Sequence, residues 1–155
     1  MSLGGNSMLA QTPAPSRPSK VEEGLAAAKD LPHTATKSAV RRVLVVDDEA
    51  LVRWAIGQTL DPHLYEITEA ADAESAARAL RESAVPHVVL LDLRLPDCND
   101  LRLLEIVRRL APAATVILMT AFGSPEVRGA AARLGAAFVL DKPFDLDSLP
   151  ELLRV

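Results

Sequence analysis

The chain has 155 residues, of which 49% are hydrophobic and 25% charged, a composition typical of one folded domain with some additional sequence. Aromatic residues contribute only 3%, so the core has to be built from Val, Leu, Ile and Ala. The formal net charge of −4 excludes the basic excess of a nucleic-acid-binding domain. No apolar run approaches the ~20 residues that span a bilayer, and the single cysteine excludes an internal disulfide. We therefore expect a cytoplasmic protein that contacts neither nucleic acid nor membrane directly.

Residues 1–40 differ in composition from the rest of the chain. Prolines recur among Ser, Thr, Gly and Ala residues, and no strand-like run is present. Such a segment buries too little apolar surface to offset the entropy lost on ordering it. We interpret residues 1–40 as a flexible N-terminal extension, with a cloning remnant at residues 1–3, and residues 41–155 as the folded domain.

From residue 41 onward, strand-like and helix-like segments alternate. Continuous apolar runs predict strands buried on both faces at 43–46, 88–91 and 116–119, an alternating segment predicts an edge strand at 65–70, and a fifth strand follows at 136–140. Apolar residues at helical spacing predict helices over 52–59, 73–80, 103–110 and 127–134, and a short final helix over 146–153. This alternation predicts an α/β fold, a doubly wound parallel sheet with helices on both faces.

Boundary residues agree with these elements. Asp72 is a typical N-cap for the second helix, and Ser124 followed by Pro125 is typical of the start of the fourth. Gly135 stands where a left-handed residue ends that helix.

Polar residues follow the strands at their carboxyl ends, where ligands bind in parallel sheets. Asp47 and Asp48 follow the first strand, Asp92 the third, Thr120 the fourth and Lys142 the fifth. Clustered carboxylates repel one another, and a divalent cation removes that cost. Oxygen ligands without histidine or thiol partners favour Mg²⁺, with Mn²⁺ as the alternative.

This set of side chains suits phosphoryl transfer. A carboxylate can act as nucleophile and form an acyl phosphate, while the metal serves as template and charge sink. Lys142 would bind one phosphoryl oxygen as a point charge, and Thr120 would donate a hydrogen bond to another. Each residue alone has an ordinary interpretation, as a helix cap, a turn residue or a surface lysine. Their occurrence at separate strand ends favours a shared site.

Four short motifs carry a family resemblance: VVDDE at 45–49, LLDLRLP at 90–96, MTA at 119–121 and LDKPF at 140–144. In this order they resemble the receiver domain of bacterial two-component response regulators, over residues 41–153. The resemblance implies a flavodoxin-like, CheY-like fold with strand order 2-1-3-4-5. It also implies that Asp92 accepts a phosphoryl group from a sensor histidine kinase or a histidine phosphotransfer domain. The domain would then switch conformation and control an output or partner in a phosphorelay.

The resemblance assigns the metal ligands. Asp48, Asp92 and the backbone carbonyl of Arg94 would bind Mg²⁺ directly, and Asp47 would act mainly through water. The chemistry would be limited to phosphotransfer onto the domain itself and slow autodephosphorylation, so we do not expect an enzyme.

The resemblance also implies a switch. The hydroxyl of Thr120 would turn toward the phosphate and the ring of Phe138 would swing inward, although Phe138 is equally well interpreted as a core residue. The Lys142–Pro143 bond would be cis. Arg94 and Phe122 occupy the positions that govern hydrolysis in the family, and their bulk predicts a persistent phosphoryl group.

The chain departs from the family after Pro96, which is followed by Asp97, Cys98, Asn99 and Asp100, with Asp97 and Asp100 in place of the usual glycines. Asp and Asn tolerate left-handed geometry, so we expect the turn to be kept, with unusual negative charge beside the site.

The partners expected from the sequence are a kinase and a second copy of the chain. Trp54 lies off the apolar stripe of its helix, where it either docks the kinase's helices or is covered by the N-terminal extension. A homodimer would form through the fourth helix, the fifth strand and the fifth helix. MTAFG at 119–123 is similar to receivers of enhancer-binding transcription activators, and we expect an output domain, absent from this chain, beyond residue 155.

Two other functions remain open at this point. The first is a metal-dependent phosphatase with an aspartyl-phosphate intermediate, although Arg94 stands where such an enzyme needs a second acid. The second is an interaction module that works without phosphorylation.

Overall fold

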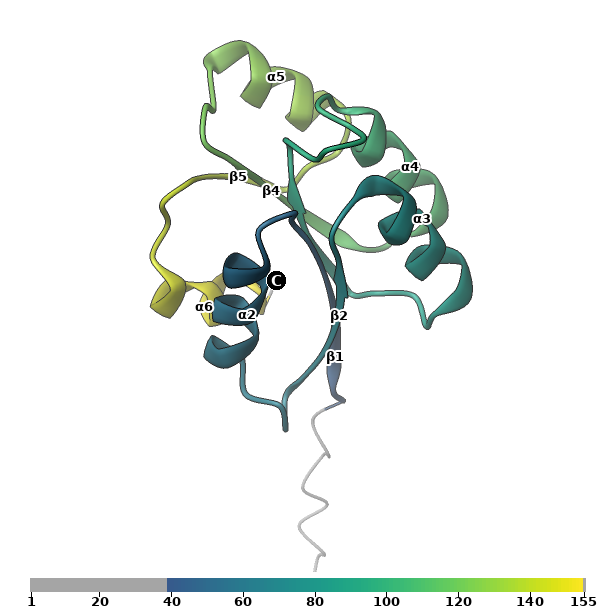
Figure 1. Cartoon of the computed structure of the whole chain (residues 1–155), viewed down its shortest axis with the longest axis vertical. Coiled ribbons are helices and arrows are strands. Elements are labelled where there is room, and N and C mark those ends of the chain that lie inside the picture. The colour runs from purple at the N-terminus through teal and green to yellow at the C-terminus, as the bar shows by residue number, and fades with distance from the viewer. Residues whose placement is uncertain (1–38, 155) are drawn as a thin grey trace, which may run out of the picture. The chain divides into compact units, whose positions relative to one another are not determined.

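The computed structural model describes residues 39–154, a parallel sheet of five strands connected by helices (Figure 1). The strands are β1 (Arg41–Val46), β2 (Tyr65–Ala70), β3 (Val88–Asp92), β4 (Thr115–Thr120) and β5 (Phe138–Asp141). The helices are α2 (Ala50–Thr59), α3 (Ala73–Glu82), α4 (Arg102–Leu110), α5 (Pro125–Arg133), the 3₁₀ turn η1 (Leu146–Ser148) and α6 (Leu149–Leu152). The strand order is β2-β1-β3-β4-β5, which confirms the predicted fold class.

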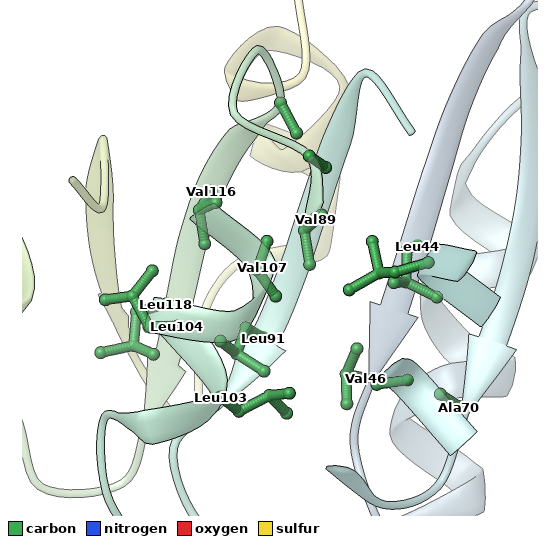
Figure 2. Packing of buried hydrophobic residues seen from close by; sticks show 14 of the residues in the cluster. Leu44, Val46, Ala70, Val89, Leu91, Leu103, Leu104, Val107, Val116 and Leu118 are labelled. Atoms are coloured by element: carbon green, nitrogen blue, oxygen red, sulfur yellow. The ribbon is translucent and has the colours of Figure 1, made fainter. Parts of the chain in front are cut away.

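The strands bury opposite side chains on opposite faces of the sheet, as the pleat requires. On one face α3, α4 and α5 cover a cluster that includes Leu44, Val46, Leu91 and Leu118 (Figure 2). On the other face α2 and α6 cover Val43, Val45, Leu90, Ile117 and Met119. Both faces of the central strands are therefore dry, which explains their unbroken apolar sequence.

The edge strands differ from the central ones. β3 is buried along its whole length, whereas β2 combines buried, half-buried and exposed residues and β5 has only half-buried and exposed ones. The prediction of an edge strand at 65–70 is confirmed, since within residues 39–154 β2 pairs only with β1.

The predicted boundary residues hold their elements in place. The Asp72 carboxylate accepts the backbone N–H of Ser75 in a capping box, and the Ser124 hydroxyl accepts the N–H of Val127. Gly135 has φ 93°, a left-handed conformation that favours glycine. These predictions are confirmed.

Some helices differ from their predicted bounds. α2 begins at Ala50, two residues before the first apolar position of its stripe. The predicted helix at 146–153 is divided into η1 and α6, with Pro150 near the start of α6. The buried Leu149 and Leu153 still anchor this end of the chain beneath α2.

The proposed N-terminal extension lies almost entirely outside the described residues. Within the described part of the chain, no helix is long and apolar enough to cross a membrane.

Candidate functional site

The acidic residues predicted to converge lie together at the carboxyl ends of β1 and β3. Asp47 is fully buried, Asp92 is 6% exposed, and Asp48 is exposed at the rim. Each of the three offers a carboxylate oxygen, and these oxygens lie within 4.8 Å of one another. Their convergence confirms the geometry expected of parallel strand ends.

Lys142 joins these acids from the end of β5. Its Nζ donates hydrogen bonds to Asp47 Oδ2 at 2.7 Å and to Asp92 Oδ2 at 2.9 Å. Glu49 Oε1 lies 3.6 Å from the same nitrogen, a contact that the sequence analysis did not anticipate. The following Lys142–Pro143 peptide bond is cis, as predicted. One ammonium group is thus shared among carboxylates from the first and third strand ends.

The electrostatics of the site oppose an ionised Asp92. Burial raises the pKa of the Asp92 carboxyl, and the nearby Asp47 raises it further, while the hydrogen bonds from Lys142 and the Arg94 N–H only partly offset this. Burial lowers the pKa of Lys142, but its hydrogen bonds to the two acids outweigh burial and the net pKa is raised. Lys142 is therefore charged at neutral pH and balances one of the three acids.

The donor set fits a hard divalent cation. The cluster of Asp47, Asp48 and Asp92 carries three carboxylates against the single ammonium group of Lys142, so the cluster alone keeps an excess of about two negative charges, to which Glu49 adds another. All the ligand atoms are carboxylate oxygens, the type that Mg²⁺ prefers. Receiver-type Mg²⁺ binding through Asp47, Asp48 and Asp92 is consistent with this arrangement.

The loops that carry the acids are held by hydrogen bonds to their backbone. Asp47 Oδ1 accepts the N–H of Glu49 at 2.9 Å, and Asp92 Oδ1 accepts the N–H of Arg94 at 3.2 Å. Arg53 on α2 donates to the Asp47 carbonyl at 2.7 Å and pairs with Glu69. The sequence analysis missed Arg53, because a side chain bound to a main-chain oxygen has no motif that marks it.

Thr120 and Phe138 lie on neighbouring strands and differ in burial. Thr120 is fully buried, one residue beyond Met119, which pairs with Asp92 across the sheet. Its Oγ1 accepts the Phe122 N–H at 3.1 Å, so the hydroxyl proton is available to another acceptor. The Phe138 side chain is 38% exposed, which contradicts the alternative of a buried core residue.

Arg94 and Phe122, predicted separately to obstruct water, contact each other. The Arg94 guanidinium lies 4.9 Å from the centroid of the Phe122 ring, in a cation–π arrangement. Phe122 itself is 67% exposed, so the pair lies on the outside of the molecule. Arg94 follows Asp92 by two residues and Phe122 follows Thr120 by two, so the pair connects the loops after β3 and β4.

A groove lies beside Lys142, between α2 and the segment that follows β5. Its volume is about 470 Å³, and its lining includes Leu51, Val52, Ala55 and Phe144. On α2 itself, Leu51 is 79% exposed and Trp54 is 61% exposed. The prediction that Trp54 lies on a wet face is confirmed.

Comparison with known proteins agrees with this geometry. The family model described as the response regulator receiver domain matches residues 43–154. The photosynthetic apparatus regulatory protein RegA of Rhodobacter capsulatus is 30% identical over 113 residues, which are 73% of this chain and 61% of RegA. The regulatory protein AtoC of Escherichia coli is 37% identical over 112 residues, 72% of this chain and 24% of AtoC. The chain thus spans only part of the length of these relatives.

A solved structure has a similar fold. The CheY-like receiver domain protein of Methanospirillum hungatei JF-1 superposes with a TM-score of 0.70 at 28% identity, covering 75% of this chain and 92% of that one.

Proposed function

The chain belongs to the family of response regulator receiver domains, and from this premise we propose that it is a phosphorylation-operated switch with Asp92 as its phosphoacceptor. The observation that carries the proposal is the contact of Lys142 with both Asp47 and Asp92, which gathers the ends of β1, β3 and β5 into one site. The donor would be a phosphohistidine on a sensor kinase or on a histidine phosphotransfer domain.

In the proposed reaction, a carboxylate oxygen of Asp92 forms a bond to phosphorus. The bond from phosphorus to the donor histidine breaks, and its electron pair returns to the imidazole nitrogen. When bound, Mg²⁺ would neutralise charge on the acids and on the transferred group; Asp48, Asp92 and the Arg94 carbonyl are proposed to bind it directly and Asp47 through water. Mn²⁺ has the same preference for oxygen ligands and could replace it.

Lys142 and Thr120 would respond to the new group. Lys142 already contacts Asp92, so its ammonium group needs only a small displacement to bind a phosphoryl oxygen. The buried Thr120 hydroxyl would donate its proton to a second oxygen. When the Thr120 side chain turns toward the phosphate, it would leave space beside β4, and the partly exposed Phe138 ring would fill that space. The ring's movement would change the surface formed by α5 and β5.

The partner surfaces are proposed from the same geometry. The groove beside Lys142, together with exposed Leu51 and Trp54, lies next to the phosphoacceptor and fits the helices of a histidine-bearing partner. A second copy would dock on α5, β5 and the η1–α6 segment. The output would be transcriptional, in the cytoplasm, and carried by other parts of a longer regulator.

The partner surface can be tested separately from the chemistry. Trp54→Ala should slow phosphotransfer from a purified phosphohistidine donor protein and leave labelling by acetyl phosphate unchanged. Val85→Ala removes an exposed apolar side chain from the opposite end of the sheet and serves as control. Equal slowing of both reactions by Trp54→Ala would contradict docking.

Labelling by acetyl phosphate tests the phosphoacceptor. With Mg²⁺ present, mass spectrometry should detect one added phosphoryl group on the parent and none on Asp92→Asn. Asp61→Asn, which changes an exposed acid far from the site, should label normally. Equal labelling of Asp92→Asn would refute the assignment. Turnover of a phosphomonoester would instead indicate the phosphatase, and no reaction by the parent would indicate an interaction module.

A further inference from the structure

The loop between β3 and α4 contains Asp97 and Asp100, which replace the usual glycines, and it forms a tight turn. Leu95 and Cys98 exchange two backbone hydrogen bonds, of 2.9 and 3.2 Å, across Pro96 and Asp97. Both flanking side chains are anchored in the core, where Leu95 is 5% exposed and Cys98 9%. Asp97 is exposed at the tip of this turn.

The Asp97 carboxylate binds the N-terminus of a different helix. Its Oδ1 accepts the Ala73 N–H at 2.8 Å, and its Oδ2 accepts the Glu74 N–H at 3.0 Å. The first N–H groups of a helix have no partner within the helix itself. Asp72 satisfies the next two, through its side chain to Ser75 and its carbonyl to Ala76. Asp97 therefore completes the N-terminus of α3 from a loop 23 residues away.

The same turn controls the orientation of one peptide unit. The Arg94 carbonyl and the Leu95 N–H belong to one planar trans peptide, so the two groups have opposite directions. The Leu95 N–H donates to the Cys98 carbonyl inside the turn. This hydrogen bond determines where the Arg94 carbonyl oxygen faces. Any change that loosens the turn frees that oxygen to rotate.

We propose that Asp97 is a positioning residue for the metal site, because it fastens the Leu95–Cys98 turn to α3 and so pre-orients the Arg94 carbonyl. The inference rests on the proposed function, in which that carbonyl binds Mg²⁺. The charged tip replaces the backbone freedom of glycine with two charge-assisted hydrogen bonds to a neighbouring helix. In this proposal Asp97 is not itself a metal ligand.

Asp100 provides a matched control in the same loop. Its carboxylate accepts the Arg102 N–H and contacts the Arg102 guanidinium and the Cys98 thiol. It therefore binds the start of its own helix, α4, and none of these contacts reaches α3. Removing either Asp97 or Asp100 deletes one negative charge from the same loop, a few residues after Arg94. Only the loss of Asp97, however, detaches the turn from α3.

Titration calorimetry with Mg²⁺ alone, on the full chain, tests the inference. Asp97→Ala should weaken Mg²⁺ binding by about tenfold, the lower range for loss of a group that orients a metal ligand. Asp97→Asn keeps one acceptor oxygen and should fall between Asp97→Ala and the parent. Asp100→Ala should bind as the parent does.

A second readout separates positioning from stability. Amide hydrogen exchange should accelerate at Leu95, Ala73 and Glu74 in Asp97→Ala and stay unchanged there in Asp100→Ala. If Asp97→Ala lowers the melting temperature but binds Mg²⁺ like the parent, or if Asp97→Ala and Asp100→Ala weaken binding equally, the inference is wrong. If Asp97→Ala does not fold, the Mg²⁺ affinity of Asp97→Asn decides: weaker binding than the parent supports the inference, and binding equal to the parent refutes it. Failure of the parent to bind Mg²⁺ would refute the proposed function instead.

Discussion

At the scale of single residues, the Arg94–Phe122 pair has a consequence for the lifetime of the phosphorylated state. Both residues lie two positions beyond a site residue, and their cation–π contact spans the loops after β3 and β4. A covering pair held together in this way would hinder a water molecule that approaches the acyl phosphate. The attraction is worth roughly 1 kcal/mol at an exposed position.

We therefore expect Arg94→Ala combined with Phe122→Ala to speed autodephosphorylation by about fivefold or more, the rate equivalent of one such contact. Each single variant should give most of the effect, because either change breaks the pair. Loss of label by mass spectrometry after removal of acetyl phosphate measures the rate. Two single effects that simply multiply in the double variant would mean that the residues act independently.

Sequence analysis predicted the principal side chains of the site, because they follow strand ends that converge in any parallel sheet. Asp47, Asp92 and Lys142 lie in contact as expected. It did not predict that Arg53 binds the Asp47 carbonyl or that Asp97 binds α3. Both contacts use main-chain atoms of distant residues, and main-chain atoms are the same at every position of a sequence.

At the scale of elements, His87 connects β1, β3 and β4 at their amino ends, opposite the ends that carry the acids. The His87 imidazole Nδ1 accepts the backbone N–H of Arg42 at 2.9 Å. The backbone N–H of His87 donates to the Arg42 carbonyl, and the His87 carbonyl accepts the backbone N–H of Thr115. Burial lowers the pKa of His87, and the charges of Arg42 and Arg41 lower it further. The folded state thus requires the neutral imidazole.

A lowered pKa means that the unfolded chain binds the proton more readily than the folded one. The contribution of His87 to stability is therefore complete above its unfolded pKa, near 6.5, and is lost as the pH falls through the lower folded value. Between pH 7 and 5 the free energy of unfolding should fall by less than the ~1 kcal/mol of a buried hydrogen bond, because the partly exposed imidazole is screened by solvent. In urea titrations, His87→Asn should lack this pH dependence. If the free energy of unfolding of His87→Asn falls with pH as steeply as that of the parent, the assignment to His87 is wrong.

Gly123 and Gly57 form a second test at the scale of elements. A Cβ at Gly123 would collide with the Asp141 carboxylate, which pairs with Arg128 on α5. Arg128 also donates to the carbonyls of Gly123 and Val139, and so joins α5 to β5. A Cβ at Gly57, within α2, has nothing within 4 Å.

Gly123→Ala should therefore destabilise the fold by about 1 kcal/mol or less, because the exposed Asp141 carboxylate can shift at the cost of its ion pair with Arg128. Gly57→Ala should stabilise it by about 0.5–1 kcal/mol through helix propensity. Thermal unfolding of the two variants measures both changes, and effects of the same sign would contradict the packing described around these two glycines.

Helix boundaries were predictable only where a capping side chain marks them. Asp72 and Ser124 mark α3 and α5, and both predictions are confirmed. The start of α2 has no capping hydrogen bond from a side chain, and the structure begins it two residues before the stripe. The division of the last helix into η1 and α6 was not visible either, since its leucines suit both.

At the scale of the whole molecule, the site joins the ends of three strands, so its occupation should stabilise the entire sheet. Without a bound cation, the like charges of Asp47 and Asp92 oppose folding, and Lys142 offsets only part of this. A ligand that binds only the folded state stabilises it by an amount that grows with concentration.

Mg²⁺ at about ten times its dissociation constant should therefore raise the free energy of unfolding by about 1.4 kcal/mol. Asp48→Asn, which changes the exposed acid and leaves the buried pair intact, should abolish most of this gain. Chemical denaturation with and without EDTA provides the measurement. A gain that persists in Asp48→Asn would exclude this carboxylate as a ligand.

The strand that carries Phe138 is the shortest in the sheet, with four residues, and it pairs with a neighbour on one side only. A rearrangement there breaks few contacts, whereas β1 and β3 are enclosed by helices above and below. In the proposed switch, a change at the acids would therefore be transmitted to β5, which has one neighbouring strand among the described residues, while the central strands keep their packing. β3, which has to stay rigid, and β5, which has to move, are two strands apart in the sheet.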